Sequence, residues 1–135
     1  HKVTLTGLKP ESHYVFKTES VDDQNRKLES ELLTFRTAPG SEDRAIRFTI
    51  VGDTQDQPAV NTRIANHMWN ERPDFFVIVG DLVGTGANKT HWKDHFFGSM
   101  RPLLSRIPLF PVIGNHEGDA RLYYDYMHTP APEYW

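Results

Sequence analysis

The stretch Val112-Ile113-Gly114-Asn115-His116-Glu117 leads a short apolar segment into a glycine and then into three polar side chains. The same pattern occurs twice earlier, in Ile50-Val51-Gly52-Asp53 and in Ile78-Val79-Gly80-Asp81. Each apolar segment has the length of a buried β-strand, and the sequence between successive segments has helical periodicity. A strand–helix–strand–helix–strand order indicates parallel βαβ units with right-handed crossovers, and therefore an α/β domain.

The element boundaries follow from the points at which the hydrophobic period changes. We expect strands at Ile46–Val51, Phe75–Val79 and Leu109–Ile113, and helices at Ala59–Asn70, Thr90–Arg106 and Ala120–Tyr126. The strand Phe75–Val79 is uniformly apolar, as is typical of a parallel strand covered on both faces. The second helix would carry one buried stripe, formed by Trp92, Phe96, Met100 and Leu103.

The polar residues that follow the three strands form a candidate site. Ligands of open α/β sheets bind beyond the carboxyl ends of the strands, so Asp53, Asp81 and Asn115 should converge on one crevice. Two carboxylates in one crevice repel each other unless cations neutralise them. Oxygen-rich ligands with a histidine nearby suit Mg, Mn, Fe or Zn ions. One Gly-Asp pair after a strand is usually a turn or a helix cap, but three glycine–ligand units in the same position favour a metal site.

Residues 1–39 show a different pattern. Segments at residues 2–6, 14–21 and 31–37 alternate with a period of two, are separated by turn signals, and predict antiparallel β-strands with one buried face. Three strands without a partner sheet are marginally stable, so we expect further residues upstream to complete a β-sandwich. Residues 40–45 have the composition of a linker, and the α/β domain then occupies residues 46–135.

Composition narrows the classes of function. The chain has 135 residues, 15 Lys plus Arg, 18 Asp plus Glu, a formal net charge of −3 and no Cys. A mildly acidic chain lacks the basic surface of a nucleic-acid binder, and no apolar run is long enough to span a bilayer. The lack of Cys excludes thiolate nucleophiles and Cys-ligated metals. The chain starts at His1 instead of Met, so we expect it to be a fragment of a longer protein.

Three motifs carry a family resemblance: Gly52-Asp53-Thr54-Gln55-Asp56, the sequence GDLVGTG at residues 80–86, and Gly114-Asn115-His116-Glu117. They resemble the first three motifs of the calcineurin-like metallophosphoesterase superfamily, and the ligand intervals of 28 and 34 residues are similar to that family's. The preceding segment resembles the end of a fibronectin type III or purple acid phosphatase N-terminal domain, in which Tyr14 would be the tyrosine-corner residue. The combination resembles purple acid phosphatases and their bacterial relatives.

The resemblance implies a role for each matching residue. Asp53 would bind the first metal ion, Asp81 would bridge two ions, and Asn115 would bind the second. His116 would stand beside the phosphate, while Glu117 would support the site or line the substrate rim. The implied reaction is hydrolysis of a small phosphate ester, with a monoester as the expected substrate, by a metal-bound hydroxide at a two-metal site. The metal pair, drawn from Fe, Zn, Mn and Mg, stays open.

Two positions depart from the family pattern. Gln55 stands where many members carry a His, and Gly84 stands where purple acid phosphatases carry a metal-binding Tyr. A ferric tyrosinate centre is therefore not expected, and Gln55 could give an oxygen to the first metal or form a hydrogen bond. The resemblance also implies a further His and a Gly-His-x-His motif, which these 135 residues do not contain, so this segment alone should be inactive.

Several alternatives stay open. The protein could be a phosphodiesterase or nuclease of the same superfamily, or a non-catalytic binding protein with a degenerate phosphatase fold. His91 and His95 lie one helical turn apart and could bind zinc, but we favour a solvated face. Tyr123 and Tyr124 could line the substrate entrance or pack inside. The resemblance alone implies an extracellular or periplasmic location, and the oligomeric state is not predicted.

Overall fold

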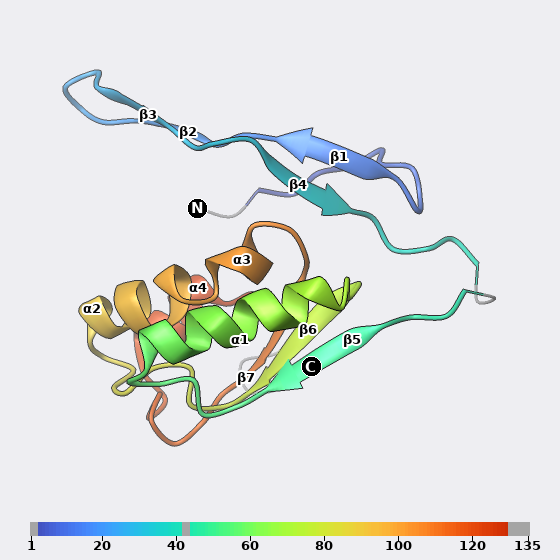
Figure 1. Cartoon of the computed structure of the whole chain (residues 1–135). Helices are drawn as coiled ribbons and strands as arrows, with labels where there is room; N and C mark the ends of the chain where they lie inside the picture. Colours follow the sequence, from blue (N-terminus) through green and yellow to red (C-terminus); the bar gives the residue numbers. More distant parts are fainter. Residues whose placement is uncertain (1–2, 42–43, 130–135) are drawn as a thin grey trace. The chain divides into compact units, whose positions relative to one another are not determined.

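The computed structural model describes residues 3–41 and 44–129. The chain divides into two compact units, His1–Ala45 and Ile46–Trp135 (Figure 1). Every described residue of the first unit is exposed or half-buried, whereas the second unit contains a buried core. The two units are therefore stabilised in different ways.

The first unit contains two antiparallel strand pairs. Strand β1 (His13–Phe16) pairs with β4 (Leu33–Arg36), and β2 (Glu19–Val21) pairs with β3 (Lys27–Glu29). The strand expected over residues 14–21 is interrupted, because the N–H of Thr18 donates to the Ser30 hydroxyl and not to a ladder carbonyl. The strand expected over residues 2–6 is also wrong for residues 3–6, which are irregular, while residue 2 lies outside the described residues.

Tyr14 fastens the turn that precedes β1. Its hydroxyl accepts a hydrogen bond from the N–H of Lys9, five residues earlier, at an N···O distance of 2.8 Å. Its ring stacks on Phe35 of β4, with centroids 5.4 Å apart. The Thr37 hydroxyl, just after β4, donates to the Lys9 carbonyl at 2.6 Å. One aromatic and one hydroxyl side chain thus tie this turn to the end of β4.

The second unit is built on a parallel sheet with the strand order β5-β6-β7 (Figure 1). Its strands are β5 (Phe48–Val51), β6 (Phe75–Val79) and β7 (Leu109–Val112), with both neighbouring pairs parallel. Helix α1 (Pro58–Asn70) connects the first two strands, and α4 (Arg121–Tyr126) follows the last. The parallel βαβ order predicted from the sequence is confirmed.

The connection from β6 to β7 is a series of short helices, so the single helix expected over Thr90–Arg106 is wrong. Helix α2 (Lys89–His91) runs into the π-helix η1 (Trp92–Gly98), and α3 (Arg101–Leu104) follows. Gly98 is a weak helix former and Pro102 has no N–H to donate to the preceding turn, which accounts for the break. The expected stripe is nevertheless buried, since Trp92, Phe96, Met100 and Leu103 are at most 1% exposed. No helix among the described residues is long and apolar enough to cross a membrane.

The two faces of the parallel sheet differ in their cover. Phe76 and Ile78 point into the helix-covered core and are fully buried. On the opposite face, four apolar side chains are between 41% and 58% exposed: Phe48, Ile50, Val79 and Val112. The expectation that β6 is covered on both faces is therefore wrong within residues 3–41 and 44–129. An apolar sheet face of this kind is a surface that a further layer normally covers.

Candidate functional site

The ends of the three parallel strands are joined by backbone hydrogen bonds. The N–H groups of Thr54 and Gln55, just after Asp53, both donate to the Asp81 carbonyl, at 2.9 and 3.1 Å. The N–H of His116 donates to Oδ1 of Asp81 at 3.0 Å. These contacts hold the segments after β5, β6 and β7 side by side at one edge of the sheet.

Asp53 and Asp81 occupy equivalent places after neighbouring strands. Each has a φ of 53°, in the left-handed region that non-glycine residues rarely adopt. The N–H of Asp53 donates to the Gly80 carbonyl at 3.3 Å. Asp53 and Asn115 are exposed, whereas Asp81 is half-buried. Backbone strain of this kind gathers at functional sites, and here it recurs at the same point after two strands.

Two glycines allow the three segments to approach each other. A Cβ on Gly114 would lie 2.3 Å from both N and Oδ1 of Asp81. A Cβ on Gly86 would lie 2.0 Å from the carbonyl oxygen of Glu117. Because both distances are far inside van der Waals contact, any side chain at either position would push the strand ends apart.

Glu117 is a buried carboxylate that joins the ends of β6 and β7. It is 1% exposed, and its oxygens accept the N–H groups of Gly114 (2.7 Å), Asp81 (3.0 Å) and Val83 (3.1 Å). These three bonds satisfy backbone donors that would otherwise lack partners in a buried place. The sequence left two roles open for Glu117, support of the site or a place at the substrate rim. Its burial favours support.

His116 is held by its ring as well as by its backbone. Its Nδ1 lies 3.1 Å from the Gly84 carbonyl oxygen. Because a carbonyl only accepts, Nδ1 carries the proton in this contact. The hydrogen bond to Gly84 is the main cause that raises the pKa of His116; partial burial opposes it, and the charges of Asp81, Asp56 and Glu117 add to it.

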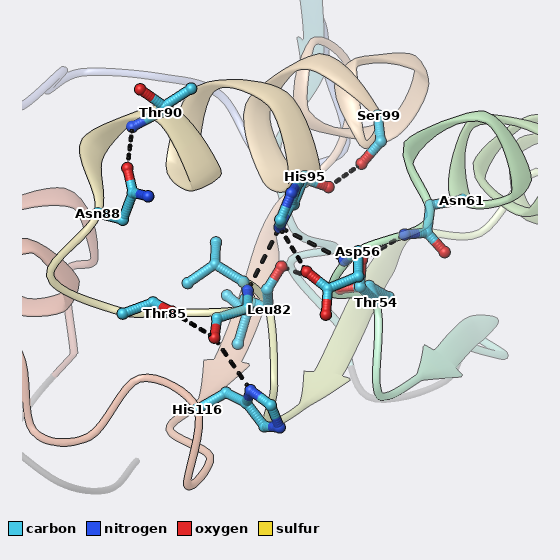
Figure 2. A network of polar contacts seen from close by, with 12 residues as sticks. Thr54, Asp56, Asn61, Leu82, Thr85, Asn88, Thr90, His95, Ser99 and His116 are labelled. Carbon is cyan, nitrogen blue, oxygen red and sulfur yellow. Dashed lines mark hydrogen bonds and ion pairs between the residues drawn. The ribbon is translucent and has the colours of Figure 1, made fainter.

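His95 lies at this site, so the solvated face favoured from the sequence is wrong for this residue. Its side chain is 15% exposed, and its Nδ1 accepts the N–H groups of Gly84 (3.3 Å) and Asp56 (3.4 Å) (Figure 2). Its ring stacks on that of His91, with centroids 4.4 Å apart. Helical spacing alone could not reveal this, because a π-helix turns its residues differently from an α-helix.

Gly84 occupies the position at which the resemblance implied a metal-binding Tyr. A Cβ on Gly84 would lie 2.3 Å from Oδ1 of Asp56. The Asp56 carboxylate therefore fills the space beside this residue, and any larger side chain would force it to move. The space next to residue 84, where a tyrosine side chain would begin, is thus occupied by the Asp56 carboxylate from the loop after β5.

The donor chemistry of the candidate site residues suits a hard metal ion. The Asp53 and Asp81 carboxylates and the Asn115 amide provide the oxygen ligands that these ions prefer. Oε1 of Gln55 is buried and has no hydrogen-bond partner within the part of the chain that the structure describes, as expected of a donor to a cation. In that same part, no three His, Cys, Asp or Glu side chains gather closely enough to hold an ion by themselves.

Of the two tyrosines left open by the sequence, Tyr123 packs in the core. It is 2% exposed, and its hydroxyl donates to the Pro111 carbonyl at 3.3 Å. Burial raises the pKa of Tyr123 to about 12, and Glu117 and Tyr124 contribute to the shift. Tyr124 is half-buried, and its hydroxyl donates to Oδ1 of Asp119.

Comparison with known families identifies the second unit. A family model described as calcineurin-like phosphoesterase matches residues 46–135, which is 90 of the 135 residues. The chain belongs to the calcineurin-like phosphoesterase family. The matched range contains Asp53, Asp81, Asn115 and His116, so all four candidate site residues lie within the phosphoesterase domain.

Similar proteins include phosphatases and one component of a nuclease. The chain is 28% identical over 142 residues to purple acid phosphatase 15 of Arabidopsis thaliana, and 27% identical over 143 residues to purple acid phosphatase 23 of the same plant. Each alignment covers 87% of this chain, but only 26% and 30% of those proteins. The chain is also 32% identical over 76 residues to a component of the nuclease SbcCD of Staphylococcus epidermidis, covering 52% of this chain and 19% of that protein.

A solved structure shares the fold. The structure of purple acid phosphatase PPD1 from yellow lupin (Lupinus luteus) seeds matches with a TM-score of 0.67 and 22% sequence identity. The match covers 84% of this chain and 22% of that chain. The chain therefore has the fold of part of that enzyme, and it spans less than a third of the length of the phosphatases to which it is similar.

Proposed function

We propose that this chain supplies part of the active site of a metal-dependent hydrolase that acts on phosphate esters. The observation that carries the proposal is the junction at Asp81, where the His116 N–H donates to Oδ1 at 3.0 Å while the Thr54 and Gln55 N–H groups donate to the carbonyl. This junction joins the segments that carry Asp53, Asp81 and Asn115. Membership of the phosphoesterase family supports the class of reaction.

Asp53, Asp81 and Asn115 would hold two metal ions. Asp81 follows β6, the central strand of the three, and would bridge the ions that Asp53 and Asn115 bind on either side. Fe, Zn, Mn and Mg ions all suit these donors. Ions bound there supply positive charge that polarises the phosphate and lowers the pKa of an attacking water. Gln55 would add an oxygen donor to the first ion.

His116 would contact the phosphate through Nε2. Its Nδ1 donates to the Gly84 carbonyl, and its N–H donates to Asp81, so both the ring and the backbone are held. A donor already in place when charge develops needs no reorganisation during the reaction, which is the basis of electrostatic stabilisation in enzymes. With Nδ1–H held by the Gly84 carbonyl, donation from Nε2 requires the imidazolium form, in which both ring nitrogens carry a proton. In that form His116 would stabilise charge on the phosphate or protonate the leaving oxygen.

We propose a small phosphate monoester as the substrate. Two similar proteins are named purple acid phosphatases, and a net charge of −3 does not favour a nucleic acid. A phosphodiester is the second candidate, because another similar protein is part of a nuclease. The ratio of hydrolysis rates for p-nitrophenyl phosphate and bis(p-nitrophenyl) phosphate distinguishes the two.

The chain would be part of a longer protein. One face of its sheet leaves Phe48, Ile50, Val79 and Val112 exposed, whereas parallel sheets are normally covered on both faces. The remainder would supply the layer over this face and the missing metal ligands, so this segment alone would be inactive.

Residues 1–39 would be the end of a fibronectin type III-like sandwich, and residues 40–45 the linker to the phosphoesterase domain. The hydrogen bond from the Lys9 N–H to the Tyr14 hydroxyl supports this, because a tyrosine corner bonds back to the backbone a few residues upstream. An extracellular or periplasmic location stays a prediction from the same resemblance.

The test uses the full-length protein, stripped of metal and then supplied with Mn²⁺, Zn²⁺, Fe²⁺ or Mg²⁺. We expect hydrolysis of p-nitrophenyl phosphate that depends on added metal. Asp81→Ala should abolish it, because the bridging carboxylate is lost. Asp125→Ala, an exposed position on α4, is the matched control and should retain full activity.

Two results would contradict the proposal. Activity retained in Asp81→Ala would overturn the assignment of the metal ligands. A wild-type protein that hydrolyses neither ester with any of the four metals would instead favour a non-catalytic binding protein.

A further inference from the structure

Gly84 is held by two histidine rings, one at its N–H and the other at its carbonyl oxygen (Figure 2). Its N–H donates to Nδ1 of His95 at 3.3 Å, and its carbonyl accepts the Nδ1 proton of His116 at 3.1 Å. His95 comes from η1, whereas His116 comes from the segment after β7. A single glycine thus connects His95 to the residue proposed to contact the phosphate.

Nδ1 of His95 is an acceptor in this arrangement. The N–H of Asp56 also donates to it, at 3.4 Å, and a nitrogen that accepts N–H groups cannot itself carry a proton. The ring is therefore neutral, with its proton on Nε2. Oδ1 of Asp56, 3.5 Å from the same Nδ1, is consequently a neighbour and not an ion-pair partner. Through one atom, His95 ties the loop after β5 to the loop after β6.

Gly84 lies against the Asp56 carboxylate, which would have to move to admit a side chain at this position. A Cβ there would meet Oδ1 of Asp56 at 2.3 Å. Glycine has more backbone freedom than any other residue, so its own sterics do not fix the direction of its carbonyl. The bond from its N–H to His95 removes part of that freedom and limits where the carbonyl can meet His116.

The ring of His95 stands on a rigid support. Trp92 and Phe96, its neighbours on η1, are at most 1% exposed, and Nε1 of Trp92 donates to the Gly86 carbonyl at 2.7 Å. The ring also stacks on His91. Turns of π-helix occur frequently at functional sites, where they place a side chain that an α-helix would turn elsewhere. The buried core therefore sets the position of this acceptor.

We propose that His95 is a positioning residue: through Gly84 it holds His116 with the proton on Nδ1 and with Nε2 left for the substrate. The role of His116 in the reaction rests on the proposed function. The chain of contacts from His95 through Gly84 to His116 does not rest on it.

Three variants distinguish the effect of losing the hydrogen-bond acceptor of His95 from the effect of losing the volume of its ring. His95→Leu removes the acceptor, His95→Asn keeps an amide oxygen near the place of Nδ1, and His67→Leu, at an exposed position on α1, is the control. Imidazole ¹⁵N spectra of the full-length protein, recorded at about pH 9, above the usual histidine pKa of about 6.5, report which nitrogen of His116 carries the proton. We expect Nδ1–H in the wild type, His95→Asn and His67→Leu, and a mixture of both tautomers in His95→Leu.

The full-length protein tests the consequence for catalysis. We expect kcat for p-nitrophenyl phosphate to fall about 10- to 100-fold in His95→Leu, the range found when residues that orient an active-site group are removed. KM should change little, because His95 does not touch the substrate. His95→Asn should restore most of kcat.

The outcomes separate this proposal from the proposed function. His116 that keeps Nδ1–H in His95→Leu overturns the positioning role, and so does an equal loss of kcat in the Leu and Asn variants. Tautomers that change as expected in a protein without hydrolytic activity support the contact and refute the function. If His95→Leu does not fold, His95→Gln replaces it, because its amide oxygen lies one bond further out than Nδ1 of His95. A mixture of both tautomers at His116 then supports the positioning role, and Nδ1–H alone overturns it.

Discussion

The two units of this chain use polar contacts of similar length for different purposes. In the first unit, Nζ of Lys17 lies 2.6 Å from Oε2 of Glu29, and the two side chains are 49% and 36% exposed. In the second unit, Oε2 of Glu117 lies 2.7 Å from the Gly114 nitrogen, and Glu117 is 1% exposed. Water competes for the first contact and is excluded from the second, so the second contributes far more to stability.

The same difference explains where a catalytic site can be built. The described residues of the first unit have no buried side chain, whereas the second unit packs Phe76, Ile78, Trp92 and Phe96 into one core. Side chains that must hold a fixed geometry need neighbours that cannot move, and only a packed core provides them. The candidate site residues accordingly lie at the edge of that core.

Trp92→Ala should give the largest effect, because it empties part of the core of the second unit. We expect a loss of about 3–5 kcal/mol in the free energy of unfolding. The Gly86 carbonyl also loses its donor. Urea unfolding followed by circular dichroism measures the loss. Leu28→Ala in the first unit, where the side chain is 74% exposed, is the comparison and should cost less than about 0.5 kcal/mol. Similar losses in both variants would contradict the distinction between the units.

Glu117→Gln should come next and tests the buried polar contact. The amide nitrogen cannot accept, so at least one of three backbone N–H groups loses its partner, at a cost of about 1–3 kcal/mol. Urea unfolding measures this, and amide hydrogen exchange at Asp81 and Val83 should become faster. Glu29→Gln, on an exposed strand, is the comparison and should cost far less, because water competes for its ion pairs. A stable Glu117→Gln variant with unaltered exchange would show that the carboxylate does not hold these loops.

The sequence could predict the strands and the buried stripe because the spacing of apolar residues indicates which side chains are buried. Each parallel strand was found where an apolar run ends in glycine, and Trp92, Phe96, Met100 and Leu103 are buried although their helix is broken. Convergence of the strand ends needs only the rule that parallel strands share a carboxyl edge.

The remaining features depend on long-range packing that periodicity does not encode. His95 faces the site because η1 is a π-helix, which no spacing rule indicates. Glu117 is buried because the ends of β6 and β7 bring three N–H groups around it, a property of the assembled sheet. The exposed face with Phe48 and Ile50 could not be anticipated either, since an apolar strand has the same sequence with one face covered or two.

Alkaline pH should perturb the second unit in a smaller and selective way. Burial raises the pKa of Tyr123 from 10.0 to about 12. A raised pKa in the folded state contributes stability that is fully present below the unfolded pKa and is lost as pH rises through the folded pKa. The second unit should therefore lose stability between about pH 10 and about pH 12. Tyr123→Phe should remove this component, which urea unfolding at a series of pH values detects as a smaller slope. An identical slope in both proteins would contradict the assignment.

The smallest effect is expected at Lys27, on the exposed β2–β3 pair. Hydrogen bonds to Glu19 and then to Glu29 raise the pKa of Lys27, and those from Lys17 and Lys27 lower the pKa of Glu29. Because the pKa of Glu29 is lowered in the folded state, its ion pairs stabilise the fold above the unfolded pKa near 4.5. This stabilisation is lost as pH falls through the folded pKa. Lys27→Met should shift the amide resonances of β2 and β3 slightly at low salt. At about 1 M salt, where screening reduces the Debye length to about 3 Å, the difference between the variant and the wild type should become smaller. A difference that high salt does not reduce would mean that packing, and not charge, holds this pair, and the contrast between the two units would then be narrower than burial alone implies.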